Sequence, residues 1–270
     1  MIKKVFAPDY PRNEQGLVLF PRDTDYRAKL FPALDPTMHV AKANAWMVKA
    51  LVEYVSEPGE HILDPFAGTG TILLGVALER RITCIEIEPA FQRIIESNIK
   101  MLKPDYPNID ELATLVPADV NLLLPIPNFC DHTIFSPPYA NVLKKTEAVT
   151  RDKTSVDLGY GAAYLYSQDP HNISNLNPFL YHQKMESIYK KLYTSLRPGG
   201  TMTIIIKDRM LARKRERLGD RAQRDCMRLG FEFVARHQWY ALGGGYSAIN
   251  RAMGLETVDE EDLITLRRPA

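Results

Sequence analysis

The stretch that most constrains the fold of this chain is TIFSPPY, residues 133–139, where an apolar, β-prone run ends abruptly in Ser136, Pro137, Pro138 and Tyr139. Neither proline has an N–H group to donate, and the first proline restricts the serine to an extended conformation. The segment therefore ends a strand and cannot continue as a central strand or a helix interior. It presents a hydroxyl, a carbonyl and an aromatic ring, which suits a planar heterocycle with an exocyclic amine. A plain proline-rich turn explains the same residues equally well.

Bulk composition describes an ordinary globular chain of 270 residues, with 45% hydrophobic and 25% charged residues. The formal net charge is +1, so any nucleic-acid surface has to be local. Cys84, Cys130 and Cys226 form no CxxC pair, which argues against a zinc site or a disulfide framework. The apolar run after Lys3 and Lys4 is too short for a signal peptide, and no stretch is long enough to span a membrane. We therefore expect a cytoplasmic protein without a bound metal.

The first 56 residues are predicted to form an arm and a helix. Residues 1–36 contain five prolines and little periodicity, which predicts an extended arm packed over a single domain of residues 37–270. Apolar residues in 40–56 recur at helical spacing. His39 and Lys42 lie at the start of this helix, where capping and solvated charge are the simpler explanations.

A strand, a glycine-rich turn and a helix follow. Residues 61–64 form a short strand, the turn is DPFAGTG, and the apolar run 71–78 predicts a buried helix. Glycines let a ligand approach the backbone closely, and a helix N-terminus offers free N–H groups. The turn lacks the lysine of a Walker loop and does not match GxGxxG. Its residues are Asp64, Pro65, Phe66, Ala67, Gly68, Thr69 and Gly70.

Acidic residues follow the next two predicted strands. Glu86 lies near the end of the strand 81–87, about 20 residues beyond the glycine turn, where nucleoside-binding units hold a ribose diol. Asp119 follows the strand 112–117 and offers an acceptor for an adenine amine, unless it only starts a loop. Strands that alternate with helices imply a parallel sheet, whose ligands bind at the carboxyl ends of the strands. Both acids and Ser136 are therefore expected at one crevice.

The second half of the chain is less regular. Residues 140–182 are polar and lack clear periodicity, which indicates an inserted loop or a target-recognition segment. Its tyrosines, including Tyr160 and Tyr164, either stack on bases or fold the loop onto the body. Periodicity predicts a helix near 185–196. Further strands are expected at residues 201–206, 231–240 and 263–266, with the last one antiparallel.

Residues 207–228 carry nine basic and four acidic side chains. Such runs are usually solvated helix faces, but this one starts at the expected functional edge of the sheet. A phosphate-contacting arm is therefore an equal alternative. The candidate contacts are Arg209, Arg213, Lys214, Arg215 and Arg217.

These motifs, followed by RPGG at 197–200, occur in the order that resembles the amino-methyltransferases that use S-adenosylmethionine. The resemblance runs from about His39 to Asp208. It implies a class I, Rossmann-like α/β fold with a mostly parallel seven-stranded sheet, helices on both faces and an antiparallel last strand. It also implies that the glycine turn binds the methionine part of the cofactor and that Glu86 binds its ribose. His39-Val-Ala-Lys42 resembles a further cofactor-pocket motif of this family.

A serine at the first position of the tetrapeptide resembles the cytosine-N4 DNA methyltransferases. The resemblance implies that Tyr139 stacks on a cytosine flipped out of double-stranded DNA. Ser136 Oγ and the Pro137 carbonyl would accept hydrogen bonds from its amine. Adenine N6 in DNA and guanine N2 in RNA are alternatives with the same chemistry. A non-catalytic cofactor-binding subunit is the alternative from another class, although it need not retain the whole tetrapeptide. A restriction endonuclease would be a companion and not a stable subunit.

Overall fold

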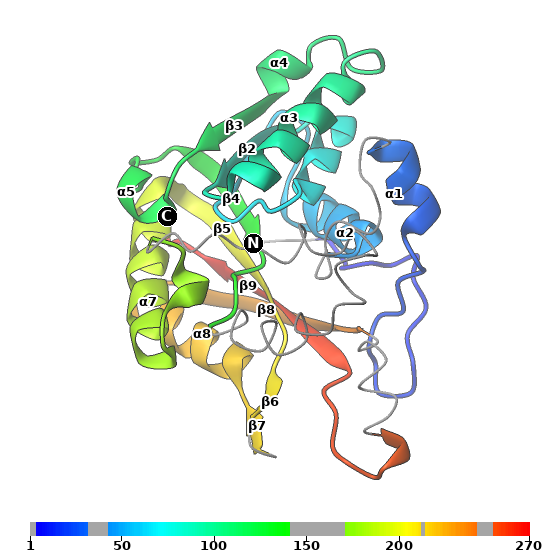
Figure 1. Ribbon diagram of the computed structural model, residues 1–270, viewed down its shortest axis with the longest axis vertical. Helices are drawn as coiled ribbons and strands as arrows, with labels where there is room; N and C mark the ends of the chain where they lie inside the picture. Colours follow the sequence, from blue (N-terminus) through cyan, green and yellow to red (C-terminus); the bar gives the residue numbers. More distant parts are fainter. Residues whose placement is uncertain (1–3, 32–42, 141–170, 212–213, 242–250) are drawn as a thin grey trace, which may run out of the picture.

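A seven-stranded sheet runs through the centre of the computed structural model, which describes residues 4–31, 43–140, 171–211, 214–241 and 251–270. The strand order is β3-β2-β1-β4-β5-β9-β8, and β9 alone runs antiparallel to its neighbours (Figure 1). This arrangement confirms the expected α/β fold, including the antiparallel last strand. The strands are β1 (His61–Asp64), β2 (Arg81–Glu86), β3 (Ala113–Pro117), β4 (Cys130–Phe135), β5 (Leu196–Ile206), β8 (Glu232–Tyr240) and β9 (Glu260–Arg267).

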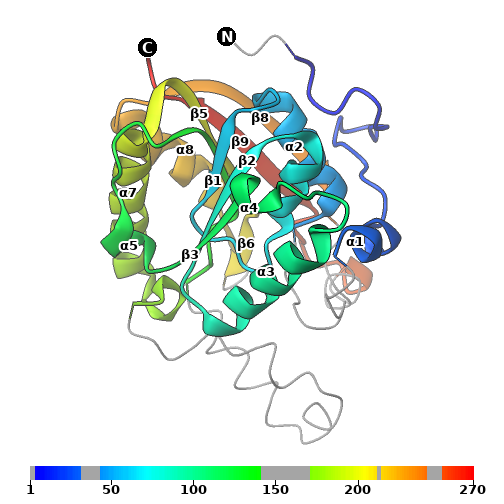
Figure 2. The same cartoon turned by 90° about the horizontal axis from the view of Figure 1, so that it is seen from above.

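Helices cover both faces of the sheet. Figure 2 shows α2 and α3 on one side and α7 and α8 on the other. Among the described residues, no helix has the length and apolar character that crossing a membrane requires. The helices are α1 (Thr24–Leu30), α2 (Ala45–Val55), the 3₁₀ helix η1 (Thr71–Leu78), α3 (Pro89–Leu102), α4 (Ile109–Leu112), α5 (Val120–Leu123), the 3₁₀ helix η3 (Ile173–Asn175), α7 (Pro178–Ser195) and α8 (Leu218–Arg228).

The interior strands are apolar on both faces because helices cover both faces. Successive side chains of a strand point to opposite sides, so each interior strand contributes to two cores. One core, under α2 and α3, contains Ile62, Ile134 and Ile205, and the other, under α7 and α8, contains Leu63, Phe135 and Ile204. The continuous apolar runs in the sequence are therefore parallel strands that are buried on both sides.

Two predicted irregular segments, residues 1–36 and 140–182, contain more regular structure than the sequence predicts. Residues 24–30 form α1, and Val18 bridges to Trp239 of β8. Helix α7 begins at Pro178, inside the predicted irregular segment, because Asn177 accepts a hydrogen bond from the Leu180 N–H at 3.0 Å. An asparagine cap followed by proline is a standard helix start, so the helix begins earlier than the apolar periodicity of residues 185–196 predicts.

The helix after the glycine turn also differs from the prediction, because η1 has 3₁₀ geometry. This helix packs tightly on β2. A Cβ atom at Gly75 would lie 2.6 Å from Ile82 Cδ1, so the glycine permits this close approach. The basic run of residues 207–228 contains the hairpin of β6 (Arg209–Leu211) and β7 (Lys214–Glu216), followed by α8.

Candidate functional site

The carboxyl ends of β1, β2, β3 and β4 meet at one crevice, as the parallel topology predicts. Its lining brings together eleven of the residues that the sequence singled out, in addition to Pro65 of the glycine turn. The predicted residues His39, Lys42, Tyr160, Tyr164 and Arg213 lie outside the described part of the chain. The eleven lining residues are Asp64, Phe66, Ala67, Gly68, Thr69, Glu86, Asp119, Ser136, Pro137, Pro138 and Tyr139.

The two glycines of the turn have different positions. Both have positive φ, +54° at Gly68 and +78° at Gly70. A Cβ atom on Gly68 would meet nothing within 4 Å, and Gly68 lines the crevice. A Cβ atom on Gly70 would lie 2.9 Å from Ile95 Cγ1, and Gly70 is not part of the lining. Gly68 thus leaves space for a ligand, whereas Gly70 lets the turn pack against α3 from behind.

Two buried carboxylates lie at the base of the crevice. Asp64 and Glu86 are 8% and 7% exposed. Burial raises the pKa of Asp64 to about 7, although a hydrogen bond from the Phe66 N–H opposes this shift. Burial likewise raises the pKa of Glu86 to about 7, against hydrogen bonds from the N–H groups of Glu88 at 2.8 Å and Gly68 at 2.6 Å. Desolvation therefore disfavours the charged form of both acids until a cation or a hydrogen-bond donor reaches them.

The charge of the lining limits what it can bind. It contains Asp64, Glu86, Glu88 and Asp119, and none of its described residues is lysine or arginine. A phosphate group in the crevice would meet four acidic side chains and no lysine or arginine among the described lining residues. A ligand with positive charge and with hydroxyl or amine donors would complement these carboxylates. These acids are not arranged as metal ligands, because no group of three or more His, Cys, Asp or Glu side chains among the described residues could hold a metal ion.

Residues 171–174 close one side of the crevice, and the sequence did not indicate this role. His171 Nδ1 lies 3.4 Å from Asp119 Oδ2, and the Asn172 amide donates a hydrogen bond to the Glu88 carboxylate. The Ser174 hydroxyl in turn donates to Asn172 Oδ1 at 2.7 Å. In the sequence, only the acidic partner Glu88 stands near a predicted site residue, two positions after Glu86. Asn172 is 84 positions from its partner, so spacing along the chain could not reveal the contact.

The tetrapeptide SPPY, residues 136–139, forms the opposite wall. The Tyr139 hydroxyl accepts a hydrogen bond from the Lys207 N–H at 2.8 Å, which fixes the outer end of the ring. Burial raises the pKa of Tyr139, so the phenol stays neutral at physiological pH. No hydrogen bond between described residues uses the Ser136 hydroxyl, which lines the crevice. Within the described residues, the wall therefore offers a hydroxyl without a hydrogen bond beside an aromatic side chain that is held in place.

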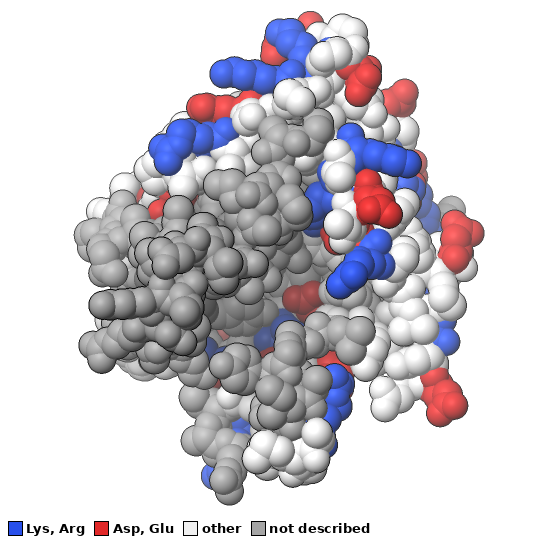
Figure 3. Space-filling model, turned by 45° about the vertical axis from the view of Figure 1, so that its right-hand side comes forward, with Lys and Arg blue, Asp and Glu red and all other residues white. Residues whose placement is uncertain are grey.

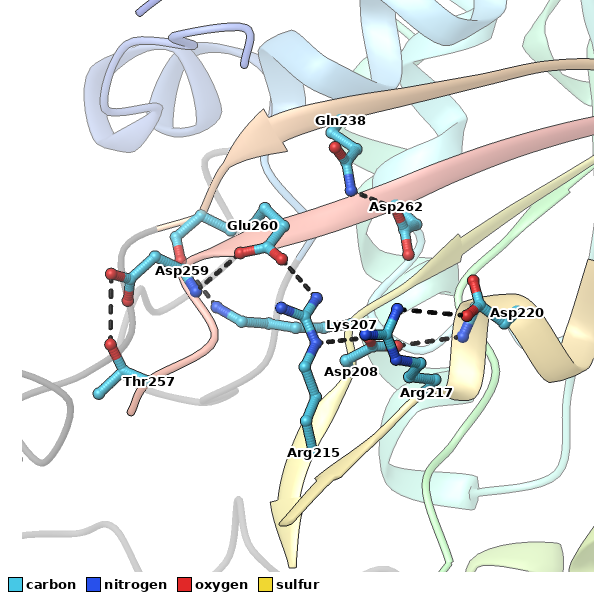
Figure 4. Close-up of polar contacts among 12 residues, drawn as sticks. Lys207, Asp208, Arg215, Arg217, Asp220, Gln238, Thr257, Asp259, Glu260 and Asp262 are labelled. Atoms are coloured by element: carbon cyan, nitrogen blue, oxygen red, sulfur yellow. Dashed lines mark hydrogen bonds and ion pairs between the residues drawn. The ribbon is translucent and has the colours of Figure 1, made fainter. Parts of the chain in front are cut away.

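The basic run is largely paired within the protein. Figure 4 shows Arg215 between Asp208 and Glu260, and its Nε lies 2.8 Å from Asp208 Oδ2. Arg209 pairs with Glu216 at 2.5 Å, and the exposed Arg217 lies 3.6 Å from Asp220.

Lys214 is exposed, and among the described residues it has no ion pair. Figure 3 shows lysine and arginine side chains scattered among acidic ones, without one broad basic patch on the coloured surface.

Comparison with solved structures identifies the class of fold. A methyltransferase from Methanosarcina mazei, titled S-adenosylmethionine-dependent, is 12% identical with a TM-score of 0.52, over 81% of this chain and 97% of that chain. TrmN from Thermus thermophilus is 14% identical with a TM-score of 0.50, over 93% of this chain and 55% of that one. The [4+2]-cyclase SpnF is 15% identical with a TM-score of 0.51, over 84% of this chain and 82% of that one. The protein has the class I methyltransferase fold, which a cyclase also has, so the fold alone does not define the reaction.

A family model described as DNA methylase, of the N6/N4 type, matches residues 9–97. The match includes the glycine turn and Glu86 and ends before the tetrapeptide. No curated protein sequence matches the chain. The fold and the family match together indicate a methyltransferase.

Proposed function

We propose that this protein transfers a methyl group from S-adenosylmethionine to the exocyclic N4 amine of a cytosine that is flipped out of DNA. The observation that carries this proposal is the crevice, which has acidic acceptors on one side and SPPY on the other. A cofactor and a base bound to these two sides would face each other across one space. Methyl transfer needs such an arrangement, because bringing two reactants together in the right orientation supplies much of the acceleration.

The cofactor side suits S-adenosylmethionine because of its charge and its acceptors. When bound, this cofactor supplies an electrophilic methyl group on a positively charged sulfonium. Asp64 would stabilise the positively charged methionine end, and Glu86 would accept hydrogen bonds from the ribose hydroxyls. Asp119 Oδ1 accepts from the Asn121 N–H at 2.8 Å, and Oδ2, which lies 3.4 Å from His171 Nδ1, would accept from the adenine amine. Gly68 would leave room for the ligand against the turn.

The target side suits an aromatic amine. Ser136 Oγ and the Pro137 carbonyl would accept hydrogen bonds from the amine, and the Tyr139 ring would stack on the base. These bonds make the nitrogen lone pair, which is otherwise delocalised into the ring, more available for attack. Positioning and electrostatics would supply most of the acceleration, and no covalent enzyme intermediate is needed.

The DNA backbone would be contacted from the β6–β7 hairpin. Lys214 is the first residue of β7 and is exposed, and Arg217 is 71% exposed despite its weak pair with Asp220. Exposed ion pairs of this kind contribute little, so Arg217 can exchange its partner for a phosphate. We retain Arg213, Tyr160 and Tyr164 in the proposed interface from the sequence alone.

One experiment tests base, atom and polymer together. The protein is incubated with S-adenosylmethionine carrying a labelled methyl group and with duplex DNA, and the product is digested to nucleosides. We expect label in N4-methylcytosine. Label in N6-methyladenine would support the adenine alternative, and label in RNA alone would support guanine N2. Cofactor binding without transfer to any nucleic acid would support a non-catalytic subunit.

A further inference from the structure

The chain directly after β5 contacts the SPPY tetrapeptide at two neighbouring points. The Lys207 N–H donates to the Tyr139 hydroxyl at 2.8 Å. Two residues later, Arg209 Nη1 donates to the Ala140 carbonyl at 3.0 Å. One contact holds the tip of the aromatic ring, and the other holds the backbone immediately after the same residue. Tyr139 is thus fixed from both ends by one short segment, residues 207–209.

Arg209 is itself held in place by the β6–β7 hairpin. Its Nε lies 2.5 Å from Glu216 Oε2, and these two residues are directly opposite each other in the hairpin. Both side chains are 27% exposed, so solvent screens this pair less than an open surface pair. His182 Nε2 also lies 4.0 Å from Glu216 Oε1, at the inner side of the pair. The planar guanidinium of Arg209 therefore makes two contacts within the protein. Its Nε lies against the Glu216 carboxylate, and its Nη1 donates to the Ala140 carbonyl.

The residue before Arg209 is anchored in a similar way. Asp208 is 3% exposed, accepts a hydrogen bond from Arg215 Nε at 2.8 Å, and accepts another from the Gly219 N–H at 3.2 Å. Arg215 also pairs with Glu260 of β9, as Figure 4 shows. These bonds join the hairpin and α8 to the carboxyl end of the sheet. Residues 207–209 are consequently a rigid support and not a loose basic arm.

From these contacts we infer that Arg209 is a positioning residue for the reaction, which acts through the Ala140 carbonyl and the Tyr139 ring and does not contact phosphate. This inference rests on the proposed function. A stacking ring must be held at a fixed angle to present the target amine to the methyl group. A misplacement of about 1 Å costs roughly 10²-fold in rate, so the support should affect turnover more than binding.

A conservative substitution separates positioning from phosphate contact. Lysine keeps the positive charge but lacks the planar fork, so it cannot hold Glu216 and the Ala140 carbonyl together. A phosphate contact, in contrast, needs mainly a charge near the strand. We therefore expect Arg209→Lys and Arg209→Gln to lower kcat by about 10²-fold at saturating DNA and cofactor. DNA affinity, its salt dependence and the affinity for S-adenosylmethionine should stay near the wild-type values.

The matched control is Arg267→Gln. Arg267 lies at the end of β9, opposite Thr201, where β5 begins to pair with β9, and so at the end of the sheet away from the crevice. Arg267 pairs with Glu232 at 2.6 Å and is 31% exposed, so the control removes a comparable ion pair. We expect it to leave kcat within a factor of about two, because surface pairs contribute little. The salt slope is the slope of log affinity for DNA against log salt concentration. If Arg209→Gln weakens DNA binding and reduces this slope by about one, while Arg209→Lys keeps wild-type affinity and slope, the residue contacts phosphate and the inference is wrong. Wild-type kcat in Arg209→Lys would also refute it.

A second measurement does not depend on methyl transfer. Exchange of the Lys207 amide hydrogen reports its bond to the Tyr139 hydroxyl, and Tyr139→Phe, which removes the acceptor, defines the fully released rate. We expect Arg209→Gln to move exchange at Lys207 toward that rate, with Arg267→Gln at the wild-type rate. Unchanged exchange in Arg209→Gln would show that Arg209 does not position the ring. If the wild-type protein methylates no nucleic acid, the proposed function fails, and this exchange experiment still tests the support of Tyr139.

Discussion

Replacing Asp64 by asparagine would measure the electrostatic cost of the acidic crevice. The substitution nearly preserves shape, and the amide oxygen can still accept the hydrogen bond from the Phe66 N–H at 2.9 Å. Burial raises the pKa of Asp64 from 3.8 to about 7. Each pKa unit corresponds to about 1.4 kcal/mol, so ionising this side chain costs the folded protein at most about 4 kcal/mol.

The sign of the pH dependence follows from the direction of this shift. The folded protein binds more protons than the unfolded chain between about pH 4 and pH 7, so this group lowers stability as pH rises through that window. Below the window the group is neutral in both states, and above it the full cost is present. The Asp64→Asn variant lacks this cost. The stability difference between variant and wild type should therefore grow by about 3 kcal/mol from pH 5 to pH 8, in favour of the variant.

Urea unfolding near pH 5, 6.5 and 8 without cofactor measures this difference, with Asp105→Asn at an exposed position as the control. In the same proteins, calorimetric titration should show that wild type binds S-adenosylmethionine more tightly as pH rises toward 7. The variant should bind weakly and with little pH dependence, because it cannot offer a carboxylate to the cation. Parallel stability curves for wild type and Asp64→Asn would refute the argument that this carboxylate is held uncharged by burial.

Three further predictions concern the SPPY tetrapeptide, the glycine turn and the β6–β7 hairpin. Ser136→Ala and Tyr139→Ala should each abolish methyl transfer while calorimetry still detects cofactor binding, and a loss of binding would mean that SPPY is not on the base side. Gly68→Ala should weaken cofactor binding more than it lowers stability. Gly70→Ala should instead lower the free energy of unfolding in urea by about 1–3 kcal/mol and affect cofactor binding less, because its Cβ would meet Ile95 at 2.9 Å. The opposite ranking of the two variants would contradict these roles. Lys214→Gln should lower the salt slope of DNA binding by about one, whereas an unchanged slope would show that Lys214 only faces solvent.

The long-range contacts of the site could not be obtained from spacing. Asn172 reaches Glu88 across 84 positions, and Arg209 reaches Ala140 across 69. Neither residue carries a local mark of its partner, because a side chain contacts whatever the packed elements bring beside it. The start of α7 differs from these contacts, because the cap at Asn177 and the following Pro178 are a local signal that the sequence itself contains.

Local geometry follows directly from the order of the residues, and it places the site at one edge of the sheet. Proline ends a strand, glycine permits positive φ, and strands alternating with helices pair in parallel, so four loops had to converge on one crevice. Only the tertiary structure decided the direction of the charged side chains. The basic run was compatible with solvent or phosphate, yet Arg209 donates to the Ala140 carbonyl and Arg215 pairs with Glu260, because folding brought these distant acceptors within reach. Charge along a chain is a local property, whereas the partner of a charge depends on packing.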